Sequence, residues 1–151
     1  MNVLTDVYSK SKRAEVMSAN RSRGNRSTEW KLRARLVQAG ISGWVIGSRE
    51  IIGKPDFSFK TKRTAIFVDG CFWHGCTRCR NIPHSNRHFW LRKIRANRIR
   101  DARVTRILRA NGWRVSRLWE HQIKENPEGC LAEIRDLISM RKGMRAPQKS
   151  S

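Results

Sequence analysis

Three cysteines and a histidine lie within one short stretch of the chain, VDGCFWHGCTRC at residues 68–79. The cysteines are spaced C-x4-C-x2-C, and thiolates at this spacing supply three of the four ligands of a tetrahedral zinc site. Clustered cysteines favour a metal site over disulfide bonds in a reducing compartment. We therefore predict that Cys71, Cys76 and Cys79 bind a structural zinc ion.

The fourth zinc ligand must come from outside this stretch. We prefer His121, because it directly follows a predicted strand at 113–120 whose end should lie beside the end of a neighbouring strand at 63–70. The alternatives are His84, His88 and Cys130. Cys130 lies in an amphipathic segment, where a buried small apolar residue is the more ordinary interpretation.

Two aspartates lie at the ends of predicted strands, and a glutamate lies on a predicted helix. Asp56 precedes the strand FSF, Asp69 ends the strand at 63–70, and Glu29 lies in the first turn of a helix at 28–38. Carboxylates at adjacent strand ends can hold a Mg²⁺ ion against a phosphate, where the ion polarises the phosphoryl group. For Asp56 alone, an ordinary turn aspartate is the alternative.

His74 is the candidate proton acceptor of this region. It lies five residues after Asp69, in the same irregular segment. The pKa of an unperturbed imidazole is near the working pH, so His74 could take a proton from an attacking water. A metal-bound or merely exposed histidine is the alternative interpretation.

Phe72 and Trp73 lie between the predicted zinc ligands. Adjacent aromatic residues most often pack in a core. Because the surroundings here are basic, the pair could instead insert between stacked bases and kink a DNA duplex. Trp90 and Met17 are weaker candidates for the same role.

The charge of the chain indicates a polyanionic partner. Lysine and arginine number 33 against 12 aspartates and glutamates, which gives a net charge of +21. Nucleic acid is the expected partner. An anionic membrane is the competing partner, but the chain has no lipidation motif, and its basic residues recur through the domain rather than in one block beside a membrane span. Residues 87–117 hold 11 basic side chains, among them Arg92 and Lys93, and we expect them to bind phosphates. The N-terminus lacks the apolar segment of a secretory signal, so we expect a cytoplasmic, nucleoid-associated bacterial protein.

Hydrophobic periodicity predicts an α/β fold. The apolar run at 63–70 is typical of a central strand that is buried on both faces. In the helix predicted at 89–111, Asn97 and Asp101 fall within the apolar stripe, where buried polar groups need partners. Together with this strand and this helix, the predicted elements are a helix at 28–38, strands at 43–48, within 53–59 and at 113–120, and a helix beginning at Asn126-Pro127. Their order predicts a mixed sheet flanked by helices.

Four blocks of the sequence, GKPDF, FVDGCFWHGC, FWLRKIRANRIRD and LRANGWRVSRLWEH, resemble the very-short-patch repair mismatch endonucleases of the Vsr type. The resemblance extends from about residue 10 to about residue 138. It implies a restriction-endonuclease-like fold, and nicking of one DNA strand 5′ of the thymine in a T:G mismatch. Such mismatches arise when 5-methylcytosine is deaminated, so the resemblance also implies a functional pairing with a cytosine-5 DNA methyltransferase.

The resemblance implies roles for residues at matching positions. Asp56 would be the metal-binding catalytic aspartate, His74 the general base, and Glu29 the helix glutamate near the site. Wedges into the DNA would be Phe72, Trp73, Trp90 and Met17, and the zinc ligands would be Cys71, Cys76, Cys79 and His121.

Two positions near the expected metal differ from the best-known members of that family. Val68 stands where those members have a threonine whose backbone carbonyl binds the metal, and a backbone oxygen survives this change. Asp69 adds a carboxylate that those members lack, and it could join the ligands of Mg²⁺. The lysine of the wider nuclease motif is absent, which favours assistance by His74.

We predict a monomeric, Mg²⁺-dependent mismatch nickase in three parts. These are a basic N-terminal arm at 1–26 that orders on DNA, an endonuclease domain at 27–140 and a flexible basic tail at 141–151. One alternative is a zinc-stabilised DNA-binding module without catalysis, which gives no reason for Asp56, His74 and Glu29 to occur together. Another is a related nuclease that acts on a different lesion, because fold and catalytic residues transfer more readily than recognition does.

Overall fold

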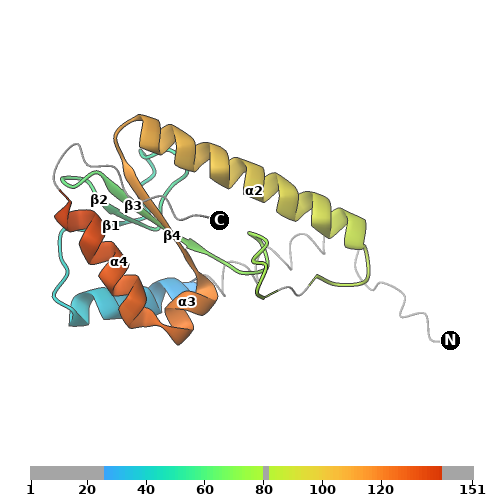
Figure 1. Cartoon of the computed structure of the whole chain (residues 1–151), viewed down its shortest axis with the longest axis horizontal. Coiled ribbons are helices and arrows are strands. Elements are labelled where there is room, and N and C mark those ends of the chain that lie inside the picture. Colours follow the sequence, from blue (N-terminus) through green and yellow to red (C-terminus); the bar gives the residue numbers. More distant parts are fainter. Residues whose placement is uncertain (1–25, 80–81, 141–151) are drawn as a thin grey trace.

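Four strands form one mixed sheet in the order β1-β2-β3-β4 (Figure 1). β1 pairs with β2 and β2 with β3 in the antiparallel sense, whereas β3 and β4 are parallel. This arrangement confirms the mixed α/β sheet that the sequence predicts. The strands are β1 (Val45–Ile46), β2 (Phe57–Phe59), β3 (Thr64–Asp69) and β4 (Arg114–Trp119).

The structure is a computed structural model that describes residues 26–79 and 82–140. The predicted arm at 1–26, except for its last residue, lies outside these residues, and so do Met17 and the predicted tail at 141–151. Four helices are described: one over residues 26–38, α2 (Arg87–Ala110), α3 (Glu120–Glu125) and α4 (Pro127–Ser139). Among them there is none with the length and apolar character that crossing a bilayer requires.

Two elements differ from the sequence prediction. The strand expected at 43–48 is reduced to Val45–Ile46, because Gly43 and Gly47 on either side have positive φ angles of 87° and 60° that end the extended backbone. The short helix α3 was not predicted. It has six residues and one buried apolar side chain, Ile123, which is too little for a periodic pattern.

β3 is the centre of the fold, and all six of its residues are buried. Its side chains alternate between two cores, as the period of a strand requires. Ile66 and Val68 belong to the core beneath the helix at 26–38 and α4, whereas Ala65 and Phe67 belong to the core beneath α2. The sheet is therefore covered by helices on both faces, which explains why the sequence of β3 is an apolar run.

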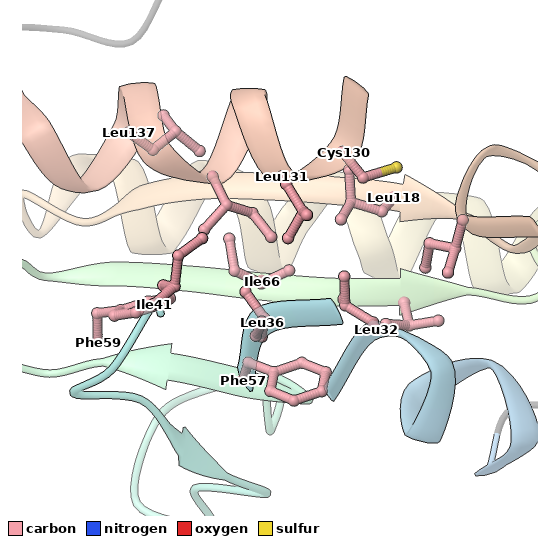
Figure 2. Close-up of a cluster of buried hydrophobic side chains, with 13 residues drawn as sticks. Leu32, Leu36, Ile41, Phe57, Phe59, Ile66, Leu118, Cys130, Leu131 and Leu137 are labelled. Atoms are coloured by element: carbon pink, nitrogen blue, oxygen red, sulfur yellow. The ribbon is translucent and has the colours of Figure 1, made fainter. Parts of the chain in front are cut away.

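The larger core joins three helices, the one at 26–38, α3 and α4, to three strands, β2, β3 and β4. Figure 2 shows Leu32 and Leu36 of the helix at 26–38 and Leu131 of α4 meeting Ile66 of β3 and Leu118 of β4. Each of these side chains is at most 3% exposed. This core fixes the helix that carries Glu29 and the two strands whose ends carry the other candidate residues.

Helix α2 connects the sheet with the segment that follows β3. Near its C-terminal end, Leu108 packs in the smaller core with Phe67. Its N-terminal part extends past the sheet (Figure 1), and there the Asn97 side chain donates to the Trp73 carbonyl at 2.9 Å. Gly75 has a φ of +68°, and a Cβ there would lie 2.6 Å from Ile94, so the segment must carry glycine to approach α2 this closely.

We expect Leu36→Ala to lower the free energy of unfolding by about 2–5 kcal/mol, because it opens a cavity in the larger core. Leu36 is 0% exposed, and its neighbour Val37 is 62% exposed. Val37→Ala is therefore the matched control and should change stability by less than about 0.5 kcal/mol. Urea denaturation of both variants is the measurement, and equal losses would contradict the assignment of this core.

Candidate functional site

The parallel pairing of β3 with β4 brings the candidate zinc ligands together. Asp69 of β3 is paired with Trp119 of β4. Cys71 and His121 each lie two residues beyond this pair, so both emerge at the same edge of the sheet. The sequence argument for His121 was based on this relation between strand ends.

The candidate ligand atoms, namely the three cysteine sulfurs and Nδ1 of His121, form a compact cluster. His121 Nδ1 lies 3.3 Å from the sulfur of Cys71, 3.6 Å from that of Cys76 and 3.5 Å from that of Cys79. Zinc bonds of the usual lengths at tetrahedral angles separate a nitrogen from a sulfur by about 3.5 Å. The cluster therefore fits a tetrahedral metal ion. The alternatives lie elsewhere: His84 and His88 are exposed, and Cys130 is buried in the larger core.

Local contacts hold the ligand-bearing segment in place. The Cys76 amide donates to the Cys71 carbonyl at 2.9 Å, which closes the turn between two of the ligands. Arg78 forms a 2.7 Å ion pair with Glu125 of α3. The Gln122 side chain accepts from the Trp119 amide at 2.9 Å, so α3 begins directly at the end of β4. His121 is thereby fixed in the first turn of α3.

The Cys71 thiol needs a nearby cation to ionise at neutral pH. Burial raises the pKa of Cys71 to about 12; a hydrogen bond from the His121 backbone lowers this pKa, and the neighbouring Cys79 and Cys76 thiols raise it. A divalent cation reverses this balance, because it stabilises thiolates directly. The group therefore has the chemistry of a metal centre.

Asp56 and Glu29 form a second site at the start of β2. The Val68 amide donates to Asp56 Oδ2 at 2.6 Å, and the Gly47 amide donates to the Asp56 carbonyl at 3.1 Å. Burial raises the pKa of Asp56 to about 8, opposed by the Val68 amide and reinforced by the adjoining carboxyl of Glu29 and by Asp69. Near neutral pH the Asp56 carboxyl group must therefore keep its proton or bind a cation.

His74 is hydrogen-bonded to a carboxylate that the sequence analysis did not propose as a site residue. Its Nδ1 forms a short hydrogen bond with Asp101 Oδ2, and the Oδ1 atom of Asp69 lies 3.7 Å away. Burial favours the neutral acid of Asp101, but the hydrogen bond with His74 and the charges around it lower its pKa. When Nδ1 donates to Asp101, Nε2 is left to accept a proton.

The sequence contained one signal for Asp101, namely its place in the apolar stripe of α2. Buried polar groups need partners, and the structure supplies them for both polar residues of the stripe. Asn97 binds the Trp73 carbonyl, and Asp101 binds His74. The sequence analysis also missed Arg117 of β4, which donates to Asp69. No sequence signal distinguished this arginine from the many basic residues of the surface.

The aromatic residues form one cluster rather than separate exposed wedges. Phe72 packs edge-on against Trp73 and Trp90, with ring centroids 5.2 and 5.6 Å apart, and Phe89 lies 4.9 Å from Trp90. Trp73 and Trp90 are 9% and 6% exposed, Phe72 is half-buried, and Phe89 is 39% exposed. The structure thus brings Phe72, Trp73 and Trp90 together. Most of the solvent-exposed surface of the cluster belongs to Phe72 and Phe89.

Nine of the 11 basic residues predicted to bind phosphates lie on the outer face of α2, whereas Arg114 and Arg117 lie in β4 and donate to groups of the protein itself, so the prediction is wrong for these two. Arg92 and Lys93 are exposed, as are the other arginines between residues 95 and 109. Near them, buried Trp90 and Ile94 hold the helix against the protein. The helix therefore presents a row of positive charge to solvent.

Comparisons with known proteins agree with one another. A family model described as DNA mismatch endonuclease Vsr matches residues 5–80 of the chain. The Type II nicking enzyme V.NmeDIP of Neisseria meningitidis serogroup C is 35% identical over 141 residues, which cover 92% of this chain and 94% of that protein. The Type II nicking enzyme V.XorIIP of Xanthomonas oryzae pv. oryzae is 36% identical over 138 residues, with 89% and 98% covered. The DNA mismatch endonuclease Vsr of Escherichia coli K12 is 34% identical over 119 residues, with 78% and 74% covered.

Replacing His121 by alanine should lower the affinity for zinc by about 100-fold or more, because loss of a partner that only orients a ligand already costs 10–100-fold. It should also lower the melting temperature, since metal binding is coupled to folding. Competition with a chromogenic zinc chelator measures the affinity. His88→Ala, at an exposed histidine, is the control, and an equal loss of zinc in that variant would contradict the proposed ligand set.

The raised pKa of Asp56 predicts a pH-dependent stability in buffer without Mg²⁺. The unfolded chain ionises Asp56 near pH 4 and the folded protein near pH 8. The stability that the protonated group contributes is therefore present below about pH 4 and is lost as the pH rises to about 8. At pH 8, Asp56→Asn should be about 1–3 kcal/mol more stable than the wild type, and added Mg²⁺ should narrow the difference. The expectation would be refuted if the wild-type free energy of unfolding, measured without Mg²⁺, stayed the same from pH 5 to pH 8.

Proposed function

The chain belongs to the Vsr family of DNA mismatch endonucleases, and from this premise we propose that it nicks one strand of duplex DNA 5′ of the thymine in a T:G mismatch. Such mismatches follow deamination of 5-methylcytosine, so the nick would begin very short patch repair beside a cytosine-5 methyltransferase. One observation carries the proposal: the Asp56–Glu29 carboxyl pair and the His74–Asp101 pair lie at the same end of β3, next to the cysteine cluster. A binding module would have no use for both pairs.

Asp56 and the Val68 carbonyl are the proposed ligands of Mg²⁺. The Val68 amide donates to Asp56, and the N–H and C=O of one strand residue point to the same side of the strand. The Val68 carbonyl is therefore directed toward the same side as Asp56. A Mg²⁺ ion bound there would polarise the scissile phosphate and lower the pKa of water. Glu29, beside Asp56, would accept a hydrogen bond from that water.

His74 is the proposed general base. Its Nε2 atom would accept a proton from water as the water oxygen attacks phosphorus and the P–O bond to the leaving oxygen of the nicked strand breaks, the leaving oxygen taking a proton from solvent. The imidazolium that results would be stabilised by Asp101 at Nδ1. Asp101 also fixes the tautomer of His74, because a carboxylate at Nδ1 holds the proton on that nitrogen. The low exposure of both side chains, 10% and 16%, strengthens this interaction by excluding water.

DNA binding is proposed to use the aromatic cluster and the outer face of α2. Phe72, half-buried and supported edge-on by Trp73 and Trp90, would enter the base stack next to the mismatch. Arg92 and Lys93 would bind phosphates. The arm at residues 1–26, with Met17, would hold the other groove.

The protein is proposed to act as a monomer with a restriction-endonuclease-like core. Mixed pairing around a buried central strand, with helices on both faces, supports that fold. The cluster of Cys71, Cys76, Cys79 and His121 is proposed to bind zinc with a structural role, because all four positions of a tetrahedral ion would be taken by protein. Zinc would then hold the segment that carries both His74 and Phe72.

Cleavage of a labelled duplex with one T:G pair in a methyltransferase site tests the proposal. We expect a single Mg²⁺-dependent nick beside the thymine, and a loss of about 10³-fold or more in Asp56→Ala, because electrostatic stabilisation of the phosphoryl group is removed. Asp136→Ala, at an exposed acid of α4, is the matched control and should cut normally.

Two further outcomes of the cleavage experiment separate the alternatives. The same duplex with T:A in place of T:G should remain uncut. Cleavage of both duplexes would retain the nuclease and discard the repair role. Tight binding without a cut, across several site sequences, would favour a DNA-binding module.

A further inference from the structure

Asp69, His74 and Asp101 form a second group whose ligand atoms lie within 4.8 Å of one another. By residue type alone, this group could hold a metal ion next to the one proposed at Asp56. However, a positively charged side chain, that of Arg117, already lies at this group. One terminal nitrogen of Arg117 lies 2.9 and 3.1 Å from the two oxygens of Asp69, and 3.7 Å from Asp101 Oδ1.

The Arg117 side chain is held along its length by two other elements, α2 and β3. Its Nε donates to the Thr105 hydroxyl of α2 at 2.9 Å, and its second terminal nitrogen donates to the Asp101 carbonyl at 3.4 Å. The guanidinium lies 4.2 Å from the centre of the Phe67 ring on β3. The side chain is 20% exposed. Arg117 is therefore a fixed part of the interior and not a mobile surface charge.

The electrostatics of the group favour the guanidinium over a second metal ion. Asp69 is 7% exposed, and one terminal nitrogen of Arg117 lies within hydrogen-bonding distance of both of its oxygens. A divalent ion among these residues would lie within a few ångströms of the Arg117 charge, in a region from which water is excluded. Repulsion between cations at that separation is strong in a low dielectric.

Arg117 also decides which carboxylate binds His74. Asp101 Oδ2 faces His74 Nδ1, whereas Asp101 Oδ1 faces Arg117. Asp69 also lies near His74 Nδ1, at 3.7 Å, but both of its oxygens are hydrogen-bonded by Arg117. Without the guanidinium, two carboxylates would compete for one ring nitrogen, and the ring would have two orientations.

We infer that Arg117 is a positioning residue for the hydrolytic reaction: it occupies the place of a cation beside Asp69, keeps Asp69 out of the Mg²⁺ site, and fixes Asp101 as the partner of His74. This inference rests on the proposed role of His74 as general base. Arg117 acts through Asp69 and Asp101, and it has no contact with the DNA in this role. The planar fork of the guanidinium suits the task, because one terminal nitrogen holds both oxygens of Asp69 while Nε and the other terminal nitrogen hold α2.

The first test compares two arginines of the same strand. Arg114 of β4 donates to the Leu137 and Met140 carbonyls at the end of α4, on the opposite face of the sheet. Arg117→Met should lower the single-turnover nicking rate at saturating Mg²⁺ by about 10²-fold, the cost of a misplaced catalytic group, with the Kd for the duplex changed less than about 3-fold. Arg114→Met should lower the melting temperature but keep the rate. Arg117→Lys keeps the charge without the fork, so it should recover only part of the rate.

The positioning role is refuted if Arg117→Met, like Arg114→Met, lowers only the melting temperature and both folded variants cut DNA at the wild-type rate. Should Arg117→Met fail to fold, Arg117→Lys carries the same comparison. A full recovery of rate by lysine would show that charge alone is needed, and would overturn the role of the fork.

The second test needs no cleavage. Mn²⁺ is titrated calorimetrically into zinc-loaded protein without DNA, in the wild type, Asp56→Asn and Asp69→Asn. Asp56→Asn should weaken Mn²⁺ binding at least about 10-fold, whereas Asp69→Asn should change it less than about 3-fold. Equal weakening by both substitutions would make Asp69 a metal ligand and overturn the inference. If the wild type cuts no mismatched duplex, the proposed function fails, and this titration still decides the place of Asp69.

Discussion

The parallel pairing of β3 with β4 is the interaction on which the rest of the site depends. Its register sets Asp69 opposite Trp119 and Phe67 opposite Arg117. The first pair brings Cys71 next to His121. The second pair places the Arg117 guanidinium over the Phe67 ring of the neighbouring strand. A slip of one residue would turn every side chain of a strand to the other face. It would separate the cysteine cluster and bury Arg117 against α4.

Burial of charge is the second constraint. Asp56, Asp69, His74 and Asp101 gather in a small volume at the end of β3, where isolated charges would be unstable. The fold meets this constraint with partners: the Val68 amide for Asp56, Arg117 for Asp69, and Asp101 for His74. Raised and lowered carboxyl pKa values within one site are what acid and base chemistry at one pH requires.

Much of this arrangement could be predicted from the sequence, because the strongest patterns are local. The apolar run of β3, the stripe of α2 and the cysteine spacing each identify an element or a ligand set. The partnerships of His74 and Asp69 depend on contacts between β3, β4 and α2, which no local pattern encodes. Asp101 was flagged as a polar residue that needs a partner, but the partner was not identified. Arg117 was hidden among 33 basic residues, and α3 is too short to show a period.

The segment from Cys71 to Cys79 serves two purposes with the same backbone. Two cysteines enclose Phe72, Trp73 and His74, and the turn that joins the cysteines also orients the histidine toward Asp101. An insertion or deletion within this segment would therefore alter the cysteine cluster and the position of His74 together. The outer face of α2 neither contributes to the cysteine cluster nor orients His74. Over evolutionary time, substitutions on the outer face of α2 can therefore accumulate without altering the cysteine cluster or His74, and the phosphate contacts proposed for that face can change independently of both.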